Sequence, residues 1–126
     1  MSTSGRRRLS DDRGQAAVEF ALALPLIVVV IVALAQVGVT VRNEIAVHHA
    51  AREGARAAVV AADPAAAARR AAAGSVGLPI EVAASVSSAR VTVTVSYVDP
   101  TDVPLIGAAL GPVTHRASVT MALEPP

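Results

Sequence analysis

The feature that most constrains this chain is a segment without charged residues near its amino terminus, residues 20–41. As a helix, a run of about 22 residues extends about 33 Å at about 1.5 Å per residue, which matches the thickness of a bilayer core. Its centre, residues 24–34, is apolar on every side, so no face is suited to water. We therefore predict a membrane-spanning helix, in which Pro25 introduces a kink of the kind that membrane helices tolerate.

The alternative for this segment is the central helix of a soluble core. Aromatic residues make up 2% of the chain, although 53% of it is hydrophobic, so the other residues offer little bulky surface to surround such a helix. A net charge of +1 does not favour a nucleic-acid partner. The absence of cysteine from the sequence excludes disulfides and thiolate chemistry.

Residues 1–14 are polar and charged without periodicity, and we expect them to be an unstructured leader. Basic residues on the two sides of the uncharged segment are Arg6, Arg7, Arg8 and Arg13 before it, and Arg42, Arg52 and Arg56 after it. Their slight excess before the segment weakly favours a cytoplasmic amino terminus.

A glycine and a carboxylate mark the entry to the apolar run. Gly14 precedes the helix, and Glu19 follows five residues later at the threshold of the hydrophobic segment. The simpler interpretation of Glu19 is an interfacial carboxylate that stabilises the first helical turn. An acid against hydrocarbon is nevertheless disfavoured without a partner. The arrangement resembles the signal of type IV prepilins, in which cleavage after the glycine leaves Gln15 as the new amino terminus.

A competing processing site lies further along. Ala33, Leu34 and Ala35, followed by Gln36, fit the small-residue rule of ordinary signal peptidase. Cleavage after Ala35 would release a soluble protein. The uncharged segment continues past this point, however, and Glu19 interrupts the basic-to-apolar transition, so we rank this alternative second.

Beyond the span the pattern becomes that of an amphipathic helix. Its strip of mostly small apolar residues comprises Ile45, Val47, Ala50, Ala51, Gly54, Ala55, Ala58, Val59 and Ala62. Because no breaker intervenes, we predict one helix from about Ala16 to Ala62. Asp63 and Pro64 are typical of an N-cap and first helical residue, and Gly74 suits the end of a short Ala-rich helix.

The last third of the sequence alternates between apolar and polar residues. Residues 90–97 place valines and Tyr97 on one face, and residues 116–123 repeat the alternation, with Ala117, Val119, Met121 and Leu123 facing inward. Residues 80–86 form a poorer first strand. A long connection with an apolar insert, residues 105–110, joins the two better strands.

Together these elements predict an α+β membrane protein. Its parts are a cytoplasmic basic leader (1–14), a transmembrane helix (15–41), an extracytoplasmic amphipathic helix with a short second helix (42–74), and a small antiparallel sheet of two or three strands (75–126).

The whole pattern resembles the TadE-like family, pseudopilins of the Tad tight-adherence pilus system. The resemblance rests on the junction from Arg13 to Phe20 with its span, on the segment Arg52, Glu53, Gly54, Ala55 and Arg56, and on the Val-rich strands. It assigns processing to Gly14, Gln15 and Glu19, and helix packing to residues 52–56. Gly54 in a helix interior also suggests close approach of the sheet or of a neighbouring subunit.

The resemblance implies a single-pass protein of the bacterial inner membrane with a cytoplasmic amino terminus, incorporation into the pilus being left open. Implied partners are a prepilin peptidase, other pilins and the Tad assembly platform, and the implied role is assembly of pili for adhesion, with secretion or DNA uptake as further roles of related systems. The alternative function is a secreted or membrane-anchored binding module of unknown ligand.

Catalytic motifs are weak. Glu44 with His48, and His49 with Glu53, have the helical spacing of metal ligands, but the two adjacent histidines point about 100° apart, so exposed polar pairs are the better interpretation. No nucleophile elbow or phosphate loop is present in the sequence. We therefore expect no enzymatic activity, no cofactor or metal, and no small-molecule substrate.

Overall fold

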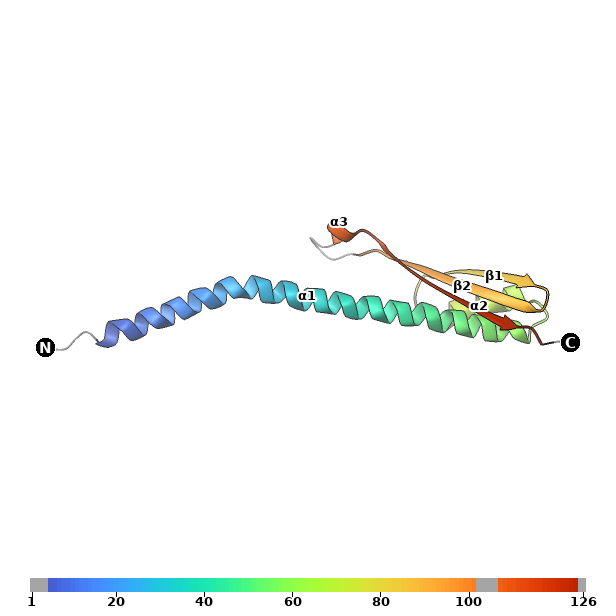
Figure 1. The fold of residues 1–126 in the computed structure, drawn as a ribbon, viewed down its shortest axis with the longest axis horizontal. Coiled ribbons are helices and arrows are strands. Elements are labelled where there is room, and N and C mark those ends of the chain that lie inside the picture. The colour runs from blue at the N-terminus through green and yellow to red at the C-terminus, as the bar shows by residue number, and fades with distance from the viewer. Residues whose placement is uncertain (1–4, 102–106, 125–126) are drawn as a thin grey trace. The chain divides into compact units, whose positions relative to one another are not determined.

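The computed structural model describes residues 5–101 and 107–124, and it divides the chain into two compact units, residues 1–39 and 40–126. Helix α1, Gly5–Val59, runs through both units and contains Pro25. Figure 1 traces the elements along the chain. The fold is α+β, as predicted: a long amino-terminal helix, a short helix and a three-stranded antiparallel sheet.

The part of α1 in the first unit exposes large apolar side chains all round. Phe20, Leu22 and Leu34 are 64%, 75% and 67% exposed, and none of the most apolar stretch is buried inside the protein. This helix is long and apolar enough to cross a membrane. The result argues against the buried-core alternative, because no part of the described chain wraps these side chains.

The start of α1 corrects one expectation. We predicted a helix from about Ala16 behind an unstructured leader, but α1 begins at Gly5. Among residues 6–14, Gly14 is the only strong helix-disfavouring type, and a single glycine costs a helix about 0.5–1 kcal/mol. A helix already formed downstream therefore extends into this polar segment by adding one hydrogen bond per residue.

Helix α2, Pro64–Ser75, follows a cap that the sequence predicted. Asp63 has an extended backbone, and its side chain accepts a hydrogen bond from the Ala66 amide at 3.1 Å. Pro64 occupies the first turn, where its missing N–H costs nothing. The boundaries shift slightly, because α1 ends at Val59 before the predicted Ala62, and α2 ends one residue after Gly74.

The sheet contains β1 (Glu81–Ser87), β2 (Arg90–Asp99) and β3 (Val113–Ala122), with β2 in the centre. Both pairings are antiparallel, and Val93 of β2 lies opposite Ala84 on one side and Val119 on the other. A short turn joins β1 to β2, and Ser88 adopts a positive φ of 53° in it. A short helix, α3 (Gly107–Leu110), precedes β3. Residues 105 and 106 of the predicted apolar insert lie outside the described residues.

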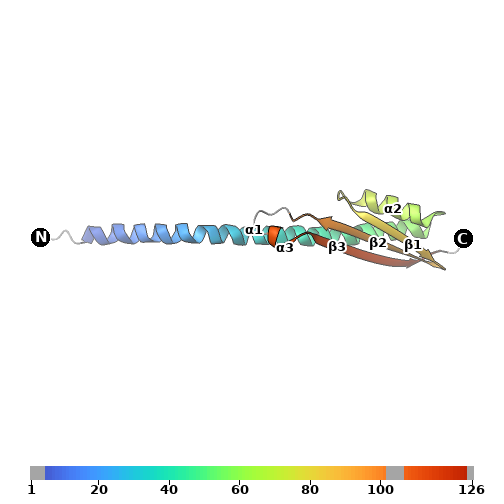
Figure 2. The same cartoon turned by 90° about the horizontal axis from the view of Figure 1, so that it is seen from above.

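The core of the second unit consists of small side chains. Val91, Val93 and Val95 are fully buried on one face of β2, as the alternation predicted. They pack with Val47, with Ala117 of β3, and with six alanines of the helices: Ala50, Ala51, Ala55, Ala58, Ala68 and Ala72. Figure 2 shows the second unit from above, with β2 between β1 and β3. Alanine and valine allow close approach of helix and sheet, which compensates for the scarcity of aromatic residues.

Two members of the predicted apolar strip are outside this core. Ile45 is 64% exposed and Ala62 is also exposed, whereas Asn43, which we did not include, is buried. The buried positions Asn43, Val47, Ala50 and Gly54 recur every three or four residues, so the packed face is narrower than the apolar strip. Ile45 falls outside that narrower face.

Candidate processing junction and helix-packing site

The junction residues lie on the exposed surface of α1 in the first unit. A side chain added at Gly14 would meet nothing within 4 Å. The Gln15 side-chain amide donates a hydrogen bond to Glu19 Oε1 at 3.2 Å, across one helical turn. Gln15 and Glu19 therefore form one polar patch at the edge of the apolar segment, immediately after Gly14.

This patch lies beside a position at which the helix is intrinsically weak. Glycine disfavours the helix by about 0.5–1 kcal/mol relative to alanine, so the backbone around Gly14 opens at lower cost than its surroundings. The Gly14 position is also sterically open. These two properties suit a peptide bond that must enter the site of another protein, and they involve no catalytic group of this chain.

In the second unit, Gly54 lies where α1, α2 and β2 meet. A Cβ built on Gly54 would lie 3.0 Å from the Ala68 carbonyl oxygen, 3.1 Å from Val93 Cγ1 and 3.2 Å from Ala72 Cβ. The close approach considered for this glycine therefore comes from the chain's own α2 and sheet. Ala55 beside it is fully buried, whereas Arg52 and Arg56 are exposed and Glu53 is half-buried.

Two polar contacts that the sequence analysis did not anticipate join α1 to the sheet. The Asn43 amide donates to Asp99 Oδ2 at 2.7 Å, and His115 Nδ1 lies 2.9 Å from Glu44 Oε2. His48 Nε2 lies 3.3 Å from the other oxygen of Glu44. We call Asn43, Glu44, Asp99 and His115 the polar clamp. Its helical residues follow directly after the uncharged segment.

The electrostatics of the polar clamp centre on Glu44. The hydrogen bond with His115 is the largest effect on the pKa of the Glu44 carboxyl and lowers it. Desolvation is the next largest effect and opposes this shift, and the electrostatic contributions of His115 and then of His48 lower the pKa further. Because the Glu44 side chain is 47% exposed, solvent screens this interaction. His115 is only 4% exposed, and its ring stacks on Tyr97 with centroids 6.2 Å apart. Its Nε2 has no hydrogen-bond partner within the described structure.

One signal in the sequence could have located His115. Counting back by twos from the inward residues Ala117 and Val119 places His115 on the buried face of β3. A count by three or four residues along α1 likewise places Asn43 on the packed face of that helix. The contact between Glu44 and His115 joins residues 71 positions apart, however, and periodicity alone does not fix which helical turn meets which strand position.

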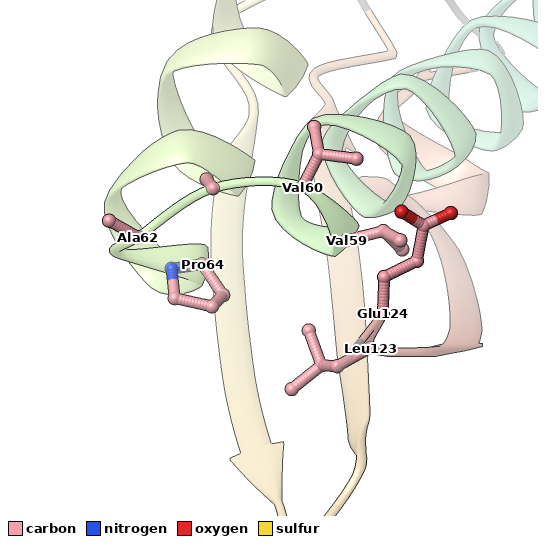
Figure 3. A pocket seen from close by; sticks show the side chains of 7 residues that line it. Val59, Val60, Ala62, Pro64, Leu123 and Glu124 are labelled. Carbon is pink, nitrogen blue, oxygen red and sulfur yellow. The ribbon is translucent and has the colours of Figure 1, made fainter. Parts of the chain in front are cut away.

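The histidine–carboxylate pairs and the cavities are the remaining polar features of the described residues. Glu44 and His48 form a half-exposed pair, as the sequence suggested, and the described residues contain no group of three or more His, Asp or Glu side chains placed to hold a metal ion. A cavity of about 540 Å³ lies between the end of α1 and the end of β3. Figure 3 shows its walls, formed by Val59, Val60, Ala62, Pro64, Leu123 and Glu124. These side chains provide one carboxylate and no nucleophile.

Comparison with protein families supports the resemblance drawn from the sequence. Residues 14–56 match the model of the family described as TadE-like protein. The matched segment is about a third of the chain; it begins at Gly14 and ends at Arg56, so it contains the processing junction, the span and the packing segment around Gly54.

Over these residues the chain is similar to TadE-like proteins, and the helix that contains them is long and apolar enough to cross a membrane. The TadE-like resemblance is confirmed over residues 14–56. Searches of curated proteins and of solved structures gave no match.

Proposed function

We propose that this chain is a TadE-like pseudopilin that is cut after Gly14 by a prepilin peptidase and then acts in the assembly of Tad pili for adhesion. The observation that carries the proposal is the coincidence of three features at one point of the chain. The family match starts at Gly14, the open and helix-weakening glycine lies there, and the Gln15–Glu19 patch follows at once.

The membrane topology of the proposal follows from the same segment. A leader with Arg6, Arg7 and Arg8 remains on the cytoplasmic side, and the uncharged segment anchors the chain in the inner membrane. The second unit then lies outside the cytoplasm, where it meets other pilins and the assembly platform. The described residues of this unit contain a core of alanine and valine of their own.

Gly14→Leu tests the processing step. A bulky residue at the cleavage position should block shortening of the chain without preventing membrane insertion, because the added side chain meets nothing within the protein itself. Gly38→Leu is the matched control, since Gly38 also lies in α1 with nothing within 4 Å. Immunoblots of membrane fractions should show the unprocessed length for Gly14→Leu alone. Normal shortening of the Gly14→Leu chain would contradict the assignment.

A further inference from the structure

A small cavity lies beside the first turn of α1 beyond the uncharged segment. Its volume is about 190 Å³, room for roughly six water molecules. Two segments line it, α1 through Arg42, Asn43 and Ala46, and the loop after α2 through Val76, Gly77 and Leu78. A cationic side chain and a short apolar loop therefore line the same cavity.

The position of this cavity along the chain places it at the surface of the membrane. Val41 ends the uncharged segment and is 52% exposed, and Arg42 is the first charged residue after it. From Arg42 to Ala46 the helix rises about 6 Å at about 1.5 Å per residue. A headgroup layer is about 5–8 Å thick on each side of the hydrocarbon core. The α1 wall of the cavity thus falls at the depth of lipid phosphates.

Arg42 is available for such a phosphate. Its side chain is exposed, and the ion pairs found in the described part of the chain use Glu44 with His48 and His115, not Arg42. Asp99 is held by the Asn43 amide and does not line the cavity. The planar guanidinium can donate two parallel hydrogen bonds to phosphate oxygens.

We propose that this cavity binds the phosphate of an anionic phospholipid headgroup, with Arg42 as the donor and with Val76 and Leu78 against the apolar part of the lipid. The proposal requires only that residues 20–41 span the membrane; it does not depend on cleavage after Gly14 or on pilus assembly. The bound lipid links the loop after α2 to the membrane surface.

The test uses the full-length chain in vesicles that contain equal amounts of phosphatidylglycerol and phosphatidylcholine. After mild detergent extraction, mass spectrometry counts the lipids that remain bound. We expect wild type to retain phosphatidylglycerol in preference, and Arg42→Gln to reduce that preference about fivefold, the size expected for one basic residue at an anionic surface. Ala46→Leu, which fills the cavity without a change of charge, should also reduce it.

Arg52→Gln is the matched control, since Arg52 is an exposed arginine on the same helix about 15 Å further from the membrane. Its lipid preference should equal that of wild type, and inorganic phosphate should not displace the bound lipid. Unchanged preference in Arg42→Gln, an equal loss in Arg52→Gln, or displacement by inorganic phosphate would overturn the proposal. The near-ultraviolet signal of Tyr97 shows whether each variant keeps its fold, because Tyr97 is the only tyrosine and packs on the core.

Discussion

At the scale of single residues, Gly54 shows how sequence dictates packing in a chain with few large side chains. Glycine weakens a helix, yet here it allows the Ala68 carbonyl and the Val93 side chain to approach α1 at distances that a Cβ would make very tight. The neighbouring alanines are fully buried for the same reason. The dispersion energy of this core therefore comes from close contacts between small side chains and not from large side chains.

Substitution of Gly54 tests this directly. Gly54→Leu should lower the free energy of unfolding by about 1–3 kcal/mol or more, because the side chain would overpack the core. Gly54→Ala should not show the increase of about 0.5–1 kcal/mol in the free energy of unfolding that Gly→Ala normally gives in a helix. Gly74→Ala in α2, where nothing lies within 4 Å, should show that gain. Denaturant unfolding followed through Tyr97 measures all three. Equal stability of Gly54→Leu and wild type would show that the contact is not tight.

The contacts of the polar clamp residues depend more on where the fold places these residues than on their residue types. The alternation along β3 places His115 on the inward face, and the fold buries it there against Tyr97 and beside Glu44. The partner of a buried polar group is set by tertiary alignment, which period-two and period-3.6 patterns do not encode.

At the scale of elements, the clamp ties α1 to the sheet, and its strength should depend on pH. The pKa of Glu44 is lowered in the folded protein, so its stabilising effect is complete above the ordinary carboxyl pKa, about 4.3. It is lost as the pH falls through the lower, folded pKa. Acidification from pH 7 to pH 3 should therefore destabilise wild type more than Glu44→Gln.

Thermal unfolding followed by the near-ultraviolet signal of Tyr97 at several pH values measures this difference. Glu44→Ala should cost about 1–3 kcal/mol at pH 7, because it leaves the buried His115 Nδ1 without its partner. Identical pH profiles for wild type and Glu44→Gln would show that the contact contributes nothing. Glu53→Gln is a suitable control, since Glu53 lies on the same helix and is not part of the clamp.

The elements differ in how well the sequence predicted them. The α2 cap and the strands that carry Val91, Val93 and Val95 could be predicted, because a cap or an alternation is a local signal. The start of α1 at Gly5 could not, since helix extension depends on the formed helix downstream. The positive φ of Ser88 in the turn could not be predicted either, because glycine or asparagine usually occupies such a position.

At the scale of the whole molecule, the two units differ in whether their apolar side chains are exposed or buried. In the first unit, the described residues from Gly5 to Val39 form a helix with exposed apolar side chains. The described residues of the second unit build a core of alanine and valine. The candidate span could be inferred from the sequence because it depends only on the order of residues. Side-chain contacts 56 and 71 positions apart in the polar clamp could not.

Assembly should depend on Glu19. After cleavage, Gln15 would carry a new amino group one turn from Glu19, and that carboxylate would pair with this amine or with that of a neighbouring subunit. Glu19→Ala should therefore insert and be cleaved, yet fail to support piliation or to co-purify with pilus partners. Glu53→Ala, a carboxylate outside the membrane segment, should keep both properties. Wild-type adhesion and partner capture by Glu19→Ala would exclude the pairing mechanism.

The mass and sequence of the mature amino terminus test the central claim most directly. Chain purified from membranes of the native host should begin at Gln15, because the proposed function requires cleavage after Gly14. A mature chain that begins at Gln36 would indicate a secreted module released by signal peptidase, and a retained leader would indicate a simple membrane anchor. Either of the last two results would contradict the proposed function.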